Sequence, residues 1–210
     1  MRRHRHNPSP EPTNEDAIPT RVALDIAALA LEQAKATGTP CAIAGGLAMQ
    51  LYGDLRSTKD VDVVADAELD IPGKKHSLSF GGYCYRVPHP TWGYVNLDVI
   101  TRSDQWSKLY QAAIIAPRLV NTKHGRVPVI SPEYLVILKY LAKRSKDQLD
   151  FEYLVTTPKM VNREKVFEII ASLFSDDAAY LLSEEIDQEI SIADWDKSRE
   201  RPKYLPLKRP

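Results

Sequence analysis

The chain has 210 residues, of which 43% are hydrophobic, and its 28 lysines and arginines balance its 28 aspartates and glutamates. This length fits one domain or a domain with a small appendage, and the hydrophobic fraction is enough to fill a core. A net charge of zero excludes a protein-wide field that attracts nucleic acid, so any such contact has to come from a local patch.

Residues 1–19 are rich in arginine, histidine, proline and acids, so we expect a disordered arm. Its basic side chains have the chemistry to touch RNA or metal, but a solvated tail is the simpler interpretation. A basic start followed by prolines and acids is not the pattern of a signal peptide. The longest apolar stretch, residues 22–36, contains two acids and has helical periodicity, which does not predict a membrane span.

The two cysteines, Cys41 and Cys84, show no metal-ligand spacing. Two scattered thiols are typical of reduced intracellular proteins, and Cys41 is expected to be a small core residue. The sequence therefore predicts a cytoplasmic protein that has no membrane partner.

The first half of the chain alternates between helix and strand. A helix is expected from Thr20, as its N-cap, to the residues before Gly38, and a brief one over residues 47–52. Glycine, proline and lysine over residues 72–75 predict a loop. The expected strands are residues 40–44, 60–64, 77–87, 94–100 and 127–130.

From Ser131 onward the pattern is helical. Ser131 followed by Pro132 is typical of an N-cap with proline at the first helical position. Further helices are expected over residues 146–155, after Asn162 and through residues 181–190. The predicted organisation is an arm over residues 1–19, a core over 20–130, a helical region over 131–195 and a flexible tail over 196–210.

Three aspartates occupy positions from which they can form a cluster. Asp60 and Asp62 alternate with valines on one strand, so their side chains point to the same face about 6–7 Å apart. Asp98 lies in WGYVNLDVIT on the face opposite the apolar side chains. If the two strands are neighbours, the carboxylates would repel one another unless divalent cations neutralised them. An acidic alternation alone is also typical of the wet face of an edge strand.

A glycine pair stands where a strand turns into a helix. Gly45 and Gly46 allow the backbone to approach a ligand closely, and N–H groups at a helix start can hold an anion. A lone glycine pair is more often only a turn. Arg56 and Thr58, directly before the acid pair, add a cation and a hydroxyl near the same edge.

This ordered set resembles the nucleotidyltransferase superfamily related to DNA polymerase β. More narrowly, GGLAMQLYGDLRSTKDVDV looks like the minimal nucleotidyltransferases that include AbiEii-type toxins of bacterial toxin–antitoxin systems. The resemblance covers about residues 23–155. It implies an α/β (α+β) fold, in which a small mixed-sheet nucleotidyltransferase core flanked by helices is followed by a C-terminal helical bundle.

The resemblance also implies roles for individual residues. Mg²⁺ or Mn²⁺ would be held by Asp60, Asp62 and Asp98, and Asp98 would accept the proton of the acceptor hydroxyl. Leu47 takes a position where many members carry a phosphate-binding serine. The nucleotide of an NTP substrate would be bound by Gly45, Gly46, Arg56, Thr58 and Lys139. Acceptor or supporting roles are implied for Arg144, Lys146, Asp147 and Asp150.

Three functions are compatible with this pattern. The resemblance implies transfer of a nucleotide to a hydroxyl of RNA, such as tRNA, or of a protein, and a toxin would add a cognate antitoxin protein as partner. A small-molecule transferase of aminoglycoside-resistance type would instead use the acidic residues 184–189 to bind a cationic acceptor. A non-catalytic nucleotide-binding module is disfavoured, because all three aspartates are present.

Aromatic residues follow the acid pair along the chain. One of them is expected to stack on a base, while most are expected to pack in the core. They are Tyr83, Tyr85, Trp92 and Tyr94.

Overall fold

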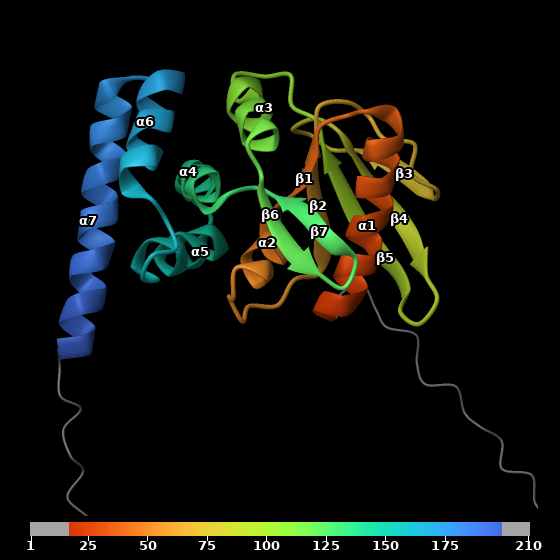
Figure 1. Cartoon of the computed structure of the whole chain (residues 1–210), viewed down its shortest axis with the longest axis horizontal. Coiled ribbons are helices and arrows are strands. Elements are labelled where there is room, and N and C mark those ends of the chain that lie inside the picture. Colours follow the sequence, from red (N-terminus) through yellow and green to blue (C-terminus); the bar gives the residue numbers. More distant parts are fainter. Residues whose placement is uncertain (1–16, 199–210) are drawn as a thin grey trace, which may run out of the picture. The chain divides into compact units, whose positions relative to one another are not determined.

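The computed structural model describes residues 17–198, and their side chains as far as residue 194 (Figure 1). The chain divides into two compact units, Met1–Ser131 and Pro132–Pro210, which we call the sheet unit and the helical unit. The expectations for residues 1–16 and 199–210 lie outside the described residues.

The sheet unit is built on one seven-stranded mixed sheet in the order β3-β4-β5-β2-β1-β7-β6. The pairs β2–β5 and β1–β7 are parallel, and the other neighbours are antiparallel. This confirms the predicted mixed α/β class. The strands are β1 (Cys41–Ile43), β2 (Asp60–Ala65), β3 (Lys74–Ser77), β4 (Tyr83–His89), β5 (Gly93–Ile100), β6 (Arg118–Thr122) and β7 (Gly125–Val129).

Helix α1 (Thr20–Thr37) covers one face of this sheet and contacts β1, β2, β4 and β5 (Figure 1). It buries an apolar stripe that includes Val22, Ile26 and Ala30, and it ends at Gly38, whose φ of 68° gives the left-handed conformation of a helix C-cap. Two shorter helices, α2 (Gly45–Leu51) and α3 (Ser107–Ile115), contact β2.

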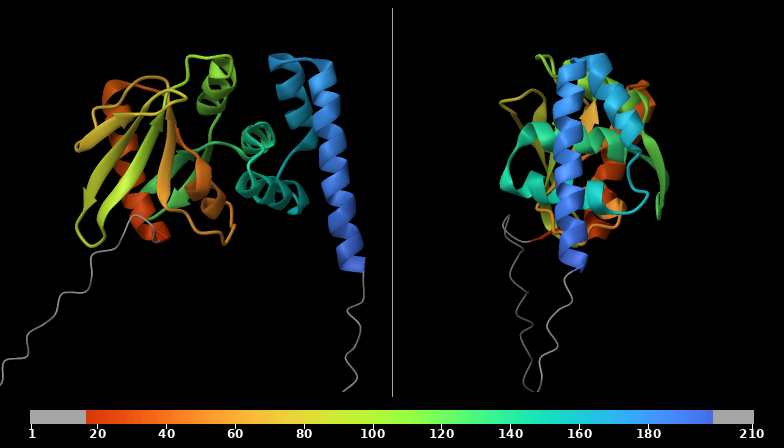
Figure 2. Two further views of the ribbon diagram at one scale, coloured as in Figure 1. Left: turned by 180° about the vertical axis from the view of Figure 1, so that it is seen from behind. Right: turned by 90° about the vertical axis from the view of Figure 1, so that its left-hand side faces the viewer.

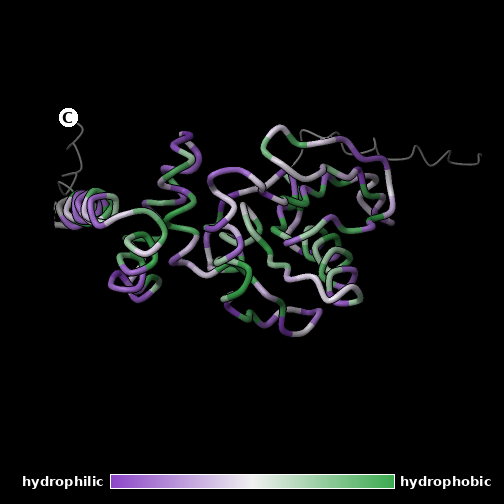
Figure 3. Tube along the Cα trace, turned by 90° about the horizontal axis from the view of Figure 1, so that it is seen from above, coloured by the Kyte–Doolittle hydropathy of each residue, from purple (hydrophilic) through white to green (hydrophobic). Residues whose placement is uncertain are grey.

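The helical unit contains four packed helices: α4 (Pro132–Ala142), α5 (Ser145–Thr156), α6 (Arg163–Leu173) and α7 (Asp176–Ser198). Helices α4 and α7 each contact both α5 and α6. Helix α6 begins after Asn162 as predicted, and Asn162 caps it, because its side-chain oxygen accepts a hydrogen bond from the Lys165 N–H at 3.0 Å. Hydrophobic segments occur in both units (Figure 3). Among the described helices, none combines the length and the apolar character that a bilayer crossing requires.

Several element boundaries differ from the predicted ones. Pro19, and not Thr20, is the N-cap of α1; the Thr20 hydroxyl instead lies 2.9 Å from the side-chain oxygen of Gln50 on α2. Helix α2 begins at Gly45, two residues earlier than expected. Pro132 is the first residue of α4 as predicted, but the buried Ser131 hydroxyl makes no hydrogen bond to any described residue.

The expected single strand over residues 77–87 is two strands, β3 and β4, and β3 begins inside the expected loop. The break lies at Gly81 and Gly82, whose φ angles of 105° and 91° cannot continue a strand. Helix α3 and strand β6 were not predicted. Strand β6 has mostly exposed side chains and is an edge strand, so its sequence carries little apolar alternation.

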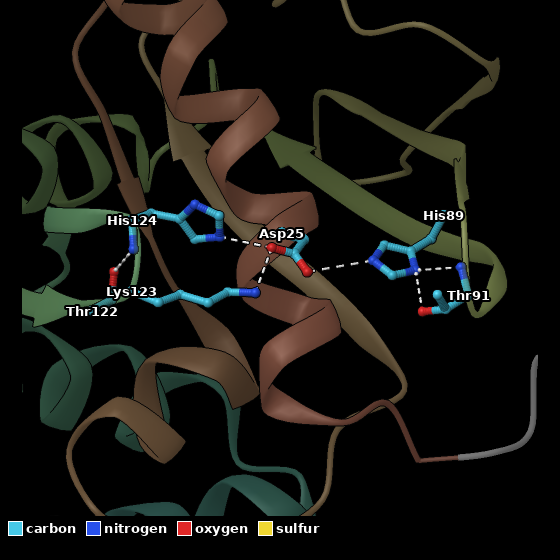
Figure 4. A network of polar contacts seen from close by, with 6 residues as sticks. All are labelled: Asp25, His89, Thr91, Thr122, Lys123 and His124. Carbon is cyan, nitrogen blue, oxygen red and sulfur yellow. Dashed lines mark hydrogen bonds and ion pairs between the residues drawn. The ribbon is translucent and has the colours of Figure 1, made fainter.

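Asp25 joins α1 to two hairpins of the sheet (Figure 4). Its carboxylate accepts hydrogen bonds from Lys123 Nζ at 2.6 Å and His124 Nε2 at 2.7 Å, and it lies 3.5 Å from His89 Nε2. The hydrogen bond from Lys123 above all, and then those from His124 and His89, lower the pKa of Asp25 to about 2. We call these four residues the Asp25 cluster.

Candidate active site

The three aspartates lie on two strands that the structure pairs directly. In the parallel β2–β5 pair, Asp62 is opposite Asp98 and Asp60 is opposite Asn96. Because side chains alternate along a strand, all three carboxylates lie on one face, which we call the carboxylate face. They are half-buried, whereas the residues between them, such as Val61 and Leu97, are fully buried on the face that α1 covers.

The glycine pair at the start of α2 packs against this cluster. Gly45 has a φ of 56°, and a Cβ at this position would lie 1.8 Å from Asp62 Oδ2. A Cβ on Gly46 would lie 2.5 Å from Thr58 Oγ1 and 3.0 Å from Arg56 Nη2. The two glycines therefore leave the space that the side chains of Asp62, Thr58 and Arg56 occupy.

Thr58 positions Asp60. Its side chain is buried, and its hydroxyl lies 3.0 Å from the carbonyl oxygen and 3.1 Å from Oδ1 of Asp60. Its own carbonyl accepts a hydrogen bond at 2.8 Å from the N–H of Ile18, directly before α1. The Thr58 hydroxyl therefore directly contacts one of the three carboxylates.

Cys84 is a member of the site that the sequence did not single out. It lies on β4 directly opposite Asp98, and its side chain is buried. Burial raises the pKa of this thiol to about 12; its hydrogen bond with Asp98 and the charges of Asp98, Asp60 and Asp62 act in the same direction. One thiol is thus influenced by all three carboxylates.

Tyr110 and Arg102 also border the cluster and were missed. Helix α3 carries Tyr110, and burial together with the charge of Asp62 raises the pKa of its hydroxyl, although Arg102 acts against this. The Arg102 guanidinium lies 5.2 Å from the centre of the Tyr110 ring and pairs with Asp104. Tyr110 could not be placed from sequence because α3 itself was not predicted, and Arg102 lies in the loop between β5 and α3.

The carboxylates are hard oxygen ligands, which suit Mg²⁺ or Mn²⁺. In their present arrangement the Asp62 carboxylate lies against Gly45 and Asp60 lies against Thr58. Within the described part of the chain, no three side chains of the types His, Cys, Asp and Glu form a group that could hold a metal ion. The donor chemistry therefore fits a divalent cation. To bind it together, the side chains of Asp60 and Asp62 would have to change rotamer and turn toward the cation.

Four of the predicted residues meet within the helical unit instead. Lys139 Nζ lies 2.9 Å from Asp147 Oδ1 and 2.6 Å from Asp150 Oδ2, and Arg144 pairs with the other oxygen of Asp147. Lys139, Asp147 and Asp150 are buried, whereas Lys146 is exposed. Burial would raise the pKa of Asp147, but the hydrogen bonds from Arg144 and Lys139 hold it below its usual value. We call Lys139, Arg144, Asp147 and Asp150 the Lys139 cluster.

No protein-family model matches the chain, and no curated protein matches it by sequence. Several solved structures are similar. An antigenic nucleotidyltransferase-like protein from Paracoccidioides brasiliensis is 17% identical, with a TM-score of 0.49 over 82% of this chain and 95% of that one. The lincomycin-bound lincosamide antibiotic adenylyltransferase LnuA is 18% identical, with a TM-score of 0.41 over 65% of this chain and 96% of that one. The antibiotic-resistance factor ANT(2'')-Ia is 12% identical, with a TM-score of 0.36 over 85% and 98%. Identities of this size leave the chemistry to be inferred from the residues of this chain.

Proposed function

We propose that the chain is a divalent-cation-dependent nucleotidyltransferase, which moves a nucleotide from an NTP to a hydroxyl acceptor and releases pyrophosphate. The observation that supports this most is the carboxylate face itself. Asp60, Asp62 and Asp98 share one face of two paired strands, and the glycine pair at the start of α2 lies directly against them. This combination gathers three anionic oxygen ligands at one place, which suits a divalent cation.

A bound Mg²⁺ or Mn²⁺ would neutralise the triphosphate and lower the pKa of the acceptor hydroxyl. The chain's own residues would do the rest. Asp60, oriented by Thr58, and Asp62, seated against Gly45, would hold the cation. Asp98 would accept the proton of the hydroxyl as general base. Arg56, beside Gly46, would offset charge on the phosphates, with the backbone of Gly45 and Gly46 close by.

The role of Lys139 differs from the one that the resemblance implies. Its ammonium group is bound by Asp147 and Asp150, both of which are buried with it. A buried lysine that already neutralises two carboxylates has little charge left for a phosphate. We therefore assign Lys139 to the stability of the helical unit and leave it out of the proposed reaction.

The test is transfer from each of the four α-labelled NTPs, with Mg²⁺ or Mn²⁺, to total RNA, cell protein or a panel of aminoglycosides. We expect Asp60→Ala and Asp98→Asn to lower the transfer rate by at least about a hundredfold, as loss of a metal ligand or general base does. Asp70→Asn is the matched control, because Asp70 is an exposed carboxylate of the same unit. Equal labelling by Asp60→Ala, or no labelled product with any acceptor, would exclude the proposal.

A toxin role is a narrower hypothesis that rests on the sequence resemblance. Expression of the chain would then arrest growth, and co-expression of the adjacent open reading frame would relieve the arrest. Asp60→Ala separates this from general overexpression stress, because the variant should be harmless if the toxicity is enzymatic.

The acidic residues 184–189 do not favour a cationic small-molecule acceptor. Three of their side chains have partners within the helical unit: Glu184 with Tyr180, Asp187 with Arg163 and Glu189 with Gln148. These surface contacts bind three of the four acids to other side chains of the helical unit, so we propose no second function for them.

A further inference from the structure

The carboxylate face continues beyond the aspartates onto the outer strands of the sheet. Asn96 on β5 is opposite Asp60 on one side and Arg86 on the other, and Arg86 is in turn opposite Lys74 on the edge strand β3. One row of side chains therefore crosses four strands. Neighbouring strands are about 4.8 Å apart, so the backbone of Lys74 lies about 14 Å from that of Asp60.

This part of the face is open to solvent. Lys74, Arg86 and Tyr94 are all exposed, Tyr94 at 49%. Helix α1 lies on the opposite face, and the view from behind shows β3, β4 and β5 in front of it (Figure 2, left). We call Lys74, Arg86, Tyr94 and Asn96 the outer row.

The cations of the outer row are available to a ligand. Among the described residues, neither Lys74 nor Arg86 forms an ion pair. Lys75 provides the contrast: it is the next residue along β3, so it points to the other face, where it pairs with Glu68 and lies 4.4 Å from the centre of the Tyr83 ring. Of the two lysines of β3, the one without an ion pair therefore lies on the side of the sheet that carries the aspartates.

An aromatic ring lies within this charged surface. The Arg86 guanidinium lies 4.5 Å from the centre of the Tyr94 ring. Tyr85, by comparison, is buried and donates a hydrogen bond to the carbonyl of Leu69 at 2.7 Å, so it is part of the core. Single-stranded nucleic acids bind surfaces of this kind, in which cations contact the phosphates and an exposed aromatic ring stacks on a base.

We propose that the outer row binds single-stranded RNA and leads its terminal ribose hydroxyl to the carboxylates. This inference rests on the proposed nucleotidyltransferase function and specifies its acceptor. The hydroxyl oxygen forms a bond to the α-phosphorus of the NTP, and the bond from that phosphorus to the β-phosphate oxygen breaks. Pyrophosphate leaves with its electron pair, and the hydroxyl proton passes to Asp98. The RNA is extended by one nucleotide.

Two features favour RNA over the other acceptors. Lys74 and Arg86 attract a phosphodiester chain and repel a cationic aminoglycoside. Asn96, between Asp60 and Arg86, carries both a hydrogen-bond donor and an acceptor, which matches the ribose 2′-hydroxyl that distinguishes RNA from DNA.

The first test is binding, which needs no catalysis. Fluorescence anisotropy with a labelled random single-stranded RNA of about 12 nucleotides, a length near the site sizes of such surfaces, gives Kd as a function of salt. We expect Lys74→Ala/Arg86→Ala to weaken binding at least about tenfold and to reduce the salt slope by about 1.4, the value for two lost phosphate contacts. Tyr94→Ala should weaken binding at least about fivefold through lost stacking.

The matched control is Lys75→Ala/Arg126→Ala. It removes the same charge from the opposite face of β3 and from an exposed position on β7. We expect it to bind RNA as the wild type does. Equal weakening in this control, or a wild type that does not bind RNA at physiological salt, would overturn the inference.

The transfer assay then separates this inference from the proposed function. Transfer of labelled nucleotide to RNA would support both the inference and the proposed function, if Lys74→Ala/Arg86→Ala reduces it at low RNA concentration and high RNA concentration restores it. Label on a protein or an aminoglycoside overturns the RNA assignment and leaves the nucleotidyltransferase standing. Equal binding and extension of single-stranded DNA of the same sequence would also overturn the assignment to RNA. RNA binding without any labelled product would overturn the acceptor role together with the proposed function.

Discussion

Gly45 and Gly46 are glycines because other side chains occupy the space that their Cβ atoms would need. The carboxylate of Asp62 fills that space at Gly45, and Thr58 and Arg56 fill it at Gly46. These five residues, which lie between positions 45 and 62 of the chain, therefore constrain one another. The glycine pair is a packing requirement of the candidate site and more than a turn.

We expect Gly45→Ala to displace Asp62 and to destabilise the protein by roughly 2–4 kcal/mol, because it combines a left-handed φ with a direct clash. Nucleotide transfer should fall with it. Thermal unfolding and the transfer assay measure the two effects.

Gly38→Ala is the control for this prediction. Gly38 has a similar φ of 68°, but nothing lies within 4 Å of its Cβ position, so only the backbone cost of about 1 kcal/mol remains. If both variants lose the same stability and the same activity, the packing interpretation of Gly45 is wrong.

At the scale of elements, α1 is connected to the sheet by more than its apolar stripe. The Asp25 cluster links this helix to the end of β4 and to the turn between β6 and β7 (Figure 4). Its contribution depends on pH because the pKa of Asp25 is lowered from 3.8 to about 2 on folding. A lowered pKa stabilises the folded state above the unfolded value and loses this effect as the pH falls through the folded one.

Asp25→Asn should therefore cost about 1 kcal/mol in the free energy of unfolding at pH 7, a value discounted for the partial exposure of the carboxylate. The difference from wild type should shrink as the pH is lowered from about 4 towards 2. Urea unfolding at pH 7 and pH 3 measures it. A difference that is the same at both pH values would show that the charge of Asp25 is not responsible.

The Lys139 cluster plays the corresponding part in the helical unit, where it connects α4 to α5. Lys139→Met should leave two buried carboxylates without their main cation and destabilise this unit by about 3–5 kcal/mol. Urea unfolding followed by far-ultraviolet circular dichroism measures the loss.

Lys146→Met is the matched control, because Lys146 is an exposed lysine on the adjoining turn of α5. It should change stability by less than about 0.5 kcal/mol. A Lys139→Met variant that is as stable as this control, but that loses nucleotide affinity, would return Lys139 to the nucleotide-binding role that the resemblance implies.

At the scale of the whole molecule, both cysteines belong to the sheet unit and report its integrity. Burial is the main cause that raises the pKa of Cys41 and of Cys84 to about 12. The reactive thiolate is therefore scarce in the folded state. At pH 8 we expect iodoacetamide to alkylate both thiols at least about a hundredfold more slowly in the native than in the urea-unfolded protein.

Mass spectrometry of the intact protein follows this reaction, and Cys41→Ser isolates the thiol of Cys84. Rapid native labelling of Cys84 in that variant would mean that the carboxylate face opens to solvent at β4. Such a result would contradict the buried position of this thiol beside Asp98.

Sequence patterns within single segments were sufficient to predict much of the fold and part of the candidate site. Alternation placed Asp60 and Asp62 on one face of β2, and helical periodicity located α1 and the helices after Pro132. Asn162 is a residue type that often caps helices, and its side chain does cap α6. These features depend on residues that are close in sequence, so local rules of propensity and period predict them.

The tertiary structure decided everything that depends on which segments become neighbours. Pairing of β2 with β5 brings Asp98 opposite Asp62, pairing of β4 with β5 adds Cys84, and the edge strand β3 extends the carboxylate face with Lys74. The burial of Lys139 with Asp147 and Asp150 likewise depends on how α4 packs on α5. Strand order and helix packing arise from contacts between residues far apart in sequence, which no local pattern records.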